Sequence, residues 1–116
     1  MLIETAWEEA LVNHGWAWGK DLLPPAFWSS LSRLQQTTQL DSLVPAGTGK
    51  GSSFQAQGLR GDRIHWLSEG SAEEAAVLAH LHAMRADLKE RLRLPLNDLE
   101  AHLALYAPGT GYARHL

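Results

Sequence analysis

The sequence contains no cysteine, which excludes disulfide bonds and cysteine-ligated metal sites. No apolar run approaches the roughly 20 residues of a membrane-spanning helix, so we expect no membrane partner. Basic residues do not cluster with aromatic ones and the formal net charge is −3, so we expect no nucleic-acid partner. The N-terminus lacks a basic region followed by an apolar one, so we expect no signal peptide and a cytoplasmic location. The 116 residues, 45% of them hydrophobic, indicate one ordinary globular domain.

Tryptophan is abundant, with five residues in this short chain. Because an indole buries a large apolar surface, we expect the tryptophans to supply bulk to the core.

Three helices are expected. Apolar residues at helical spacing predict the first over Glu4–His14. Pro24 and Pro25 are typical of the start of a second. Ser71 and Glu74 fit a capping box at the start of the third, which we expect to end before Pro95.

Short strands are expected between and after these helices, over Trp16–Trp18, Arg60–Leu67 and Leu99–Tyr106, with a loop over Asp41–Ser53. Alternation along the last strand predicts that His102 and Tyr106 share a face. A Gly-rich turn follows, and a further strand starts at Tyr112. The helices look complete and the sheet unfinished, which indicates that part of the fold is missing.

Two motifs that could carry chemistry favour simpler interpretations. The stretch Gly47–Ser52 lacks the spacing of a phosphate-binding loop, because Lys50 is followed by Gly51, and we expect a surface loop. His80 and His82 lie two apart on a helix and point in different directions, so they cannot share one metal ion there.

Two segments carry a family resemblance. Residues 100–115 contain a Tyr-x-Pro-Gly turn leading to Tyr112-Ala113-Arg114-His115, and residues 60–66 read Arg-Gly-Asp-Arg-Ile-His-Trp. Together they resemble the prolyl hydroxylase group of Fe(II)/2-oxoglutarate dioxygenases, including the hypoxia-sensing enzymes and their bacterial relatives. The order of helices and strands also agrees, so the resemblance spans nearly the whole chain.

The resemblance implies roles for individual residues. His115 would be an iron ligand. Tyr106 would donate a hydrogen bond to 2-oxoglutarate, and His102 would line the same pocket. The substrate side would be shaped by four residues, Asp62, Trp66, Tyr112 and Arg114. Residues 45–57 would form a flap over the target residue.

The resemblance also implies an activity and a fold. The activity would be hydroxylation of prolyl residues in a protein or peptide, with Fe(II) and 2-oxoglutarate as cofactors and with L-ascorbic acid as a further compound associated with the family. The fold class would be α+β, a helical buttress plus the first strands of a double-stranded β-helix of the jelly-roll or cupin type. Residues 1–116 would be the N-terminal part of one oxygenase domain.

The family pattern is interrupted at Leu116, one residue before the expected Asp. The second and third iron ligands are therefore absent from this sequence, and we expect the 116 residues alone to be inactive. Two alternatives stay open. One is a shortened, non-catalytic interaction module that uses its helical, Trp-rich surface. The other is a metal-binding protein that uses His102 and His115.

Overall fold

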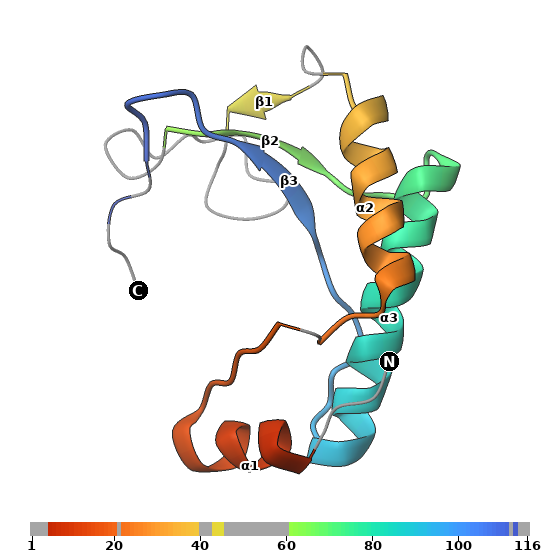
Figure 1. The fold of residues 1–116 in the computed structure, drawn as a ribbon, viewed down its shortest axis with the longest axis vertical. Coiled ribbons are helices and arrows are strands. Elements are labelled where there is room, and N and C mark those ends of the chain that lie inside the picture. Colours follow the sequence, from red (N-terminus) through yellow and green to blue (C-terminus); the bar gives the residue numbers. More distant parts are fainter. Residues whose placement is uncertain (1–4, 21, 40–42, 46–60, 112, 114–116) are drawn as a thin grey trace. The chain divides into compact units, whose positions relative to one another are not determined.

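The computed structural model describes residues 5–20, 22–39, 43–45, 61–111 and 113. In this part the chain is α+β, with three helices and one antiparallel sheet (Figure 1). It forms two compact units, each built from two stretches of sequence. The first comprises residues 1–37 and 68–99, and the second residues 38–67 and 100–116.

The first unit is helical. Helix α1 spans Thr5–His14, α2 spans Pro25–Thr37 and α3 spans Ala72–Leu92. Gly15 ends α1 with a φ of 80°, a conformation that favours glycine, and its amide donates to the Leu11 carbonyl oxygen at 3.0 Å. All three helices were expected from the sequence.

The start of α3 shows the predicted cap. The hydroxyl of Ser71 accepts from the Glu74 amide at 3.1 Å and donates to Oε2 of Glu74, also at 3.1 Å. The other oxygen of the same carboxylate accepts from the Ser68 amide at 3.1 Å. The exchange satisfies donors that a helix start leaves without a partner, so the local sequence determines where α3 begins.

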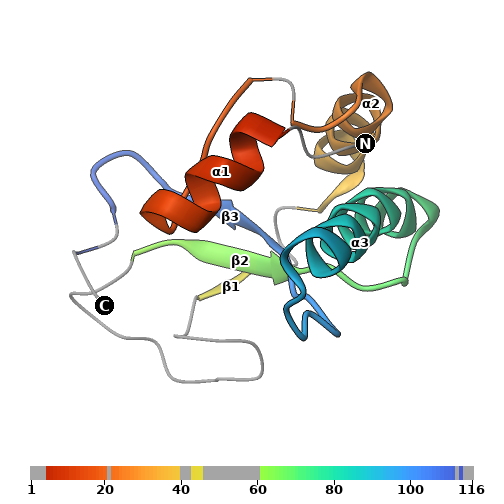
Figure 2. The same cartoon turned by 90° about the horizontal axis from the view of Figure 1, so that it is seen from below.

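The core of the first unit lies between α2 and α3, which run side by side in Figures 1 and 2. Phe27 and Leu34 are its buried residues on α2, and Val77 and Leu78 those on α3. The rings of His80 and Phe27 also meet edge to face, with centroids 5.9 Å apart. Removal of this apolar surface from water stabilises the helix pair.

The second unit contains the sheet (Figure 2). Strand β1 is Val44–Pro45, β2 is Arg63–Trp66 and β3 is His102–Leu105. The order is β1-β2-β3, and both pairings are antiparallel. Leu43, Ile64 and Leu67 are its buried hydrophobic residues in the described part.

Some local expectations were wrong. Residues 16–18 form no strand, because no described strand offers them a hydrogen-bonding ladder. Strand β1 forms inside the segment expected to be a loop, and β2 and β3 are shorter than the alternation suggested. Most of the tryptophans are also not core residues, since Trp16, Trp18 and Trp28 are all more than half exposed.

Candidate functional site

The candidate site lies on one face of β2 and β3. The register places Trp66 opposite His102 and Ile64 opposite Ala104. Directly opposed residues project to the same face of an antiparallel pair, and so do alternate residues along one strand. The rings of Trp66 and His102 meet edge to face, with centroids 4.8 Å apart and an interplanar angle of 78°.

Asp62 and Tyr106 extend this face by one step. Arg63 pairs with Leu105 at the end of the ladder. Asp62, which precedes Arg63, and Tyr106, which follows Leu105, are therefore the next opposed residues. Asp62 is 0% exposed and Tyr106 is 42% exposed. The two strands therefore bring together four of the predicted site residues, one deeply buried and one open to solvent.

A tight turn follows β3 and leads toward the predicted metal ligand. The Ala107 carbonyl oxygen accepts from the Thr110 amide at 3.1 Å and from the Thr110 hydroxyl at 2.6 Å. Pro108 followed by Gly109, whose φ is 85°, is typical of a type II turn. Beyond the turn, Gly111 accepts through its carbonyl oxygen from the Gly61 amide at 2.9 Å.

Several predicted site residues lie outside the described residues. These are Tyr112, Arg114, His115 and the flap residues 46–57. Within the described ranges, no group of three or more His, Cys, Asp or Glu side chains could hold a metal ion.

The face offers hydrogen-bonding groups spread along a strand. His102 begins β3 and Tyr106 directly follows the strand, a separation of roughly 13 Å between Cα positions at the usual rise of a strand. A ligand that contacts both side chains must therefore lie along β3. An imidazole, a phenol and an indole can all donate to the oxygens of such a ligand.

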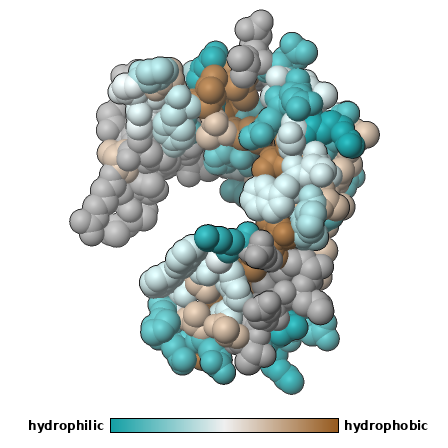
Figure 3. Space-filling model, in the orientation of Figure 1, coloured by the Kyte–Doolittle hydropathy of each residue, from teal (hydrophilic) through white to brown (hydrophobic). Residues whose placement is uncertain are grey.

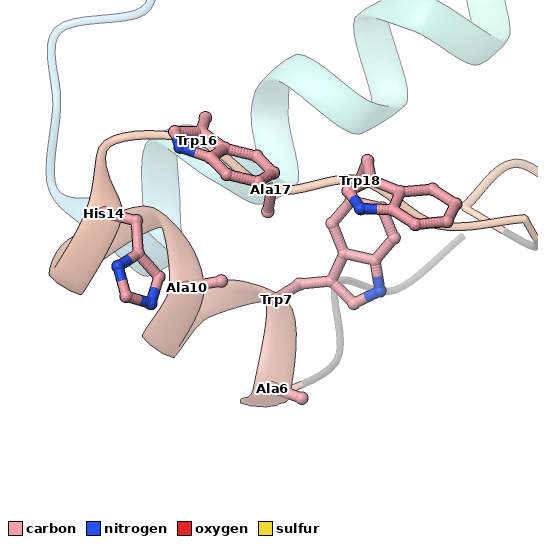
Figure 4. A pocket seen from close by; sticks show the side chains of 7 residues that line it. All are labelled: Ala6, Trp7, Ala10, His14, Trp16, Ala17 and Trp18. Atoms are coloured by element: carbon pink, nitrogen blue, oxygen red, sulfur yellow. The ribbon is translucent and has the colours of Figure 1, made fainter.

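A second concave feature lies in the first unit (Figure 4). It is a pocket of about 250 Å³ between α1 and the extended segment that follows it. Trp7 and His14 come from the helix, and Trp16 and Trp18 come from the segment. The Trp7 ring lies so close to Gly19 that a Cβ there would overlap it. Trp16 is 64% exposed and Trp18 is 74% exposed, so two indoles line the pocket while remaining open to solvent.

The lining of this pocket consists of three indoles, one imidazole and three alanine side chains. In the space-filling view, strongly hydrophobic residues form separate small areas among polar ones (Figure 3). Sequence reasoning expected the indoles in the core. The signal that could have indicated the pocket is the spacing of Trp16 and Trp18 around a small Ala17 in a segment with no partner strand among the described residues.

Comparison with solved structures then bears on the predicted resemblance. A Pseudomonas putida prolyl-4-hydroxylase matches 96% of this chain with a TM-score of 0.75 and 33% sequence identity. The predicted resemblance to the prolyl 4-hydroxylases is confirmed. The chain spans 59% of the length of that solved chain. No protein-family model matches the sequence, and no curated protein matches it either.

The match supports part of the predicted fold. The α+β class is confirmed: among the described residues, three helices and a three-stranded antiparallel sheet correspond to part of the solved structure. None of the described helices is both long enough and apolar enough to cross a membrane.

Proposed function

We propose that residues 1–116 are the N-terminal part of a single Fe(II)- and 2-oxoglutarate-dependent oxygenase domain that hydroxylates prolyl residues in a protein or peptide. The observation that carries the proposal is the match to a prolyl-4-hydroxylase over nearly the whole chain. In this proposal the sheet supplies the first strands of a double-stranded β-helix, and the helices are its buttress.

Whether this chain contributes a ligand to an iron ion depends on His115. The described residues contain no set of three metal-ligating side chains, so they do not by themselves form an iron site. His115 would be the ligand that this chain provides, and an Asp and a second His would have to come from sequence beyond Leu116. When bound, iron would let dioxygen oxidise 2-oxoglutarate to succinate and CO2, and the second oxygen atom would be inserted into an unactivated C–H bond of the substrate.

The face of β2 and β3 would bind and orient the cosubstrate. Tyr106, which is partly open to solvent, would donate its phenol hydrogen bond to a 2-oxoglutarate oxygen. His102 would line the same pocket, and its edge contact with Trp66 would restrict the imidazole to one orientation. Asp62 is fully buried, which suits a supporting role below the substrate side.

The native polypeptide provides the test. The reading frame is followed past the Leu116 codon, and the polypeptide that it encodes is expressed and supplied with Fe(II), 2-oxoglutarate, dioxygen, ascorbate and a prolyl peptide. We expect succinate to form from 2-oxoglutarate, with a peptide mass increase of one oxygen atom. His115→Ala should abolish both products, whereas the matched control His82→Ala, on α3 and outside both the candidate site and the aromatic pocket, should retain them.

Two results would contradict the proposal. One is a native polypeptide that never consumes 2-oxoglutarate, whatever prolyl peptide is offered. The other is a stop codon directly after Leu116, because the iron ligands of the family could not then be completed.

The aromatic pocket favours a second candidate function, that of an interaction module. Among the described residues that line the pocket, none but His14 can carry a charge, so an uncharged ligand fits it. Proline-rich segments meet this requirement, because their rings pack on aromatic faces and their free carbonyl oxygens accept from indole N–H groups.

Tryptophan fluorescence of the 116-residue chain tests this candidate. If the module binds such a segment, titration with a proline-rich peptide should saturate, and Trp18→Ala should weaken binding about tenfold. The control Trp28→Ala removes an exposed indole on α2 outside the pocket and should leave affinity unchanged. No saturation, or equal losses in both variants, would exclude the candidate.

A further inference from the structure

A close contact joins the start of β2 to the turn after β3. The Gly61 amide donates to the Gly111 carbonyl oxygen at 2.9 Å, outside the regular ladder of the two strands. At the same place, a Cβ on Gly61 would lie 3.0 Å from the Cβ of Thr110 and 3.4 Å from its methyl carbon. A Cβ at Gly61 would therefore make a contact tighter than an ordinary van der Waals contact, and Thr110 would have to shift by a few tenths of an ångström.

The position of the Thr110 side chain is constrained by hydrogen bonds within the turn. Its amide and its hydroxyl both donate to the Ala107 carbonyl oxygen, at 3.1 and 2.6 Å. Its Cβ is attached directly to this turn and is not the far end of a flexible side chain. The turn is itself constrained by Pro108 and by Gly109 in a left-handed conformation.

Gly61 is required for space and not for its backbone angle. Its φ lies outside the left-handed region, so an alanine could adopt the same conformation. The obstacle is the Thr110 side chain, with its Cβ nearest. A substitution at Gly61 should therefore push on the turn, and the displacement should pass to the residues that follow Gly111.

We propose that Gly61 and Thr110 are positioning residues that determine where the segment carrying His115 leaves the sheet. The contact fixes Gly111, four residues before His115, against the start of the strand that carries Trp66. The inference rests on the proposed role of His115 as an iron ligand, and it adds two residues with no ligand contact of their own.

A double-mutant cycle tests the contact in the native polypeptide. Co(II) serves as the probe for the iron site, and its visible absorption reports both affinity and ligand geometry. We expect Gly61→Ala to weaken Co(II) binding about tenfold, as is common when the support of a metal ligand is removed. In the Thr110→Gly background, which lacks the opposing Cβ, the same alanine should have little effect. Gly70→Ala, in the turn before α3, controls for the general effect of replacing a glycine.

A second variant tests the hydrogen bond from the Thr110 hydroxyl to the Ala107 carbonyl oxygen, which constrains the turn. Thr110→Val keeps the shape of the side chain and removes the hydroxyl bond to Ala107, so it should weaken Co(II) binding without adding a clash. This variant covers the case in which Gly61→Ala fails to fold. The inference is overturned if Gly61→Ala is no worse than Gly70→Ala, or if its effect is equal in the parent and Thr110→Gly backgrounds. Unchanged Co(II) binding in Thr110→Val would also count against it.

A separate readout distinguishes this inference from the proposed function. Backbone amide shifts of residues 111–116 are recorded in the metal-free polypeptide for the parent and for the Gly61→Ala variant. If the parent protein binds no Co(II), the proposed function fails, and the contact is judged by these shifts. Resonances that move in Gly61→Ala and return when Thr110→Gly is added support the contact, and resonances that do not move overturn it.

Discussion

Two aromatic residues organise the candidate site at the scale of single side chains. Trp66 and His102 belong to different strands and meet edge to face at 4.8 Å. Both are partly exposed, so their contact is an interaction between side chains at a surface and not a consequence of deep burial. Edge-to-face aromatic pairs prefer this geometry because the positive edge of one ring meets the negative face of the other.

Replacing these two residues singly and together should reveal a measurable coupling. We expect Trp66→Leu and His102→Leu to destabilise the fold by less when combined than the sum of the single changes, with a coupling of about 0.5–1.5 kcal/mol. Urea unfolding of the four proteins measures it. His65 and Leu103, opposed in the register without a ring pair, provide the control cycle. A Trp66–His102 coupling no larger than that of the control would show that the edge contact contributes nothing specific.

The sequence could predict which residues of one strand share a face. It could not predict which residues of different strands contact one another. A period of two along residues 99–106 was enough to put His102 and Tyr106 on one side. The pairing of Trp66 with His102 depends on the register between strands that lie far apart in the sequence, which no local pattern specifies. The approach of Gly61 to Thr110 has the same origin, so neither contact could be predicted.

At the scale of elements, α3 shows how a helix can end under strain. Its C-terminal cap is Arg93, with a φ of 54° and a ψ of 41°. This left-handed conformation brings the Cβ of an L-residue too close to its own backbone, and glycine is the residue that adopts it without that penalty. The side chain of Arg93 is exposed.

Arg93→Gly should therefore stabilise the protein. We expect a gain of up to about 1 kcal/mol in the free energy of unfolding, since relief of the left-handed strain exceeds the extra freedom of glycine in the unfolded chain. Thermal unfolding followed by circular dichroism measures the change. Arg93→Ala keeps the Cβ and should bring no gain. A glycine variant that melts at or below the parent temperature would contradict this account of the cap.

Elements with local signals were predicted well, and those that depend on distant partners were not. Ser71 and Glu74 locate the start of α3 through bonds between neighbours in sequence. Residues 16–18 alternate like a strand yet have no strand beside them in the described part, so the pattern alone could not form one. Val44 and Pro45 do form a strand because β2 pairs with them, although their own sequence resembles a loop.

At the scale of the whole molecule, the two units differ in how their backbones are protected. The first contains a 21-residue helix and a 13-residue helix with a shared buried core. The sheet of the second has strands of two, four and four residues. Short strands with few buried contacts open at low free-energy cost. We expect hydrogen exchange to show slower amides in α3 than in β3.

The edge of the sheet allows a last prediction that tests the proposed fold. Among the described residues β3 pairs with β2 alone, so the β3 amides that point away from β2 have no ladder partner there. If the native polypeptide continues into a double-stranded β-helix, a further strand must pair with this edge, because an open edge invites association with other chains. These amides should exchange rapidly in the 116-residue chain and become protected in the longer polypeptide, while the amides of α3 change little.

Hydrogen exchange followed by NMR compares the two proteins directly. Equal exchange at this edge in both would mean that no strand is added beside β3, and the proposed β-helix would have to be abandoned even if the helices match the solved prolyl-4-hydroxylase.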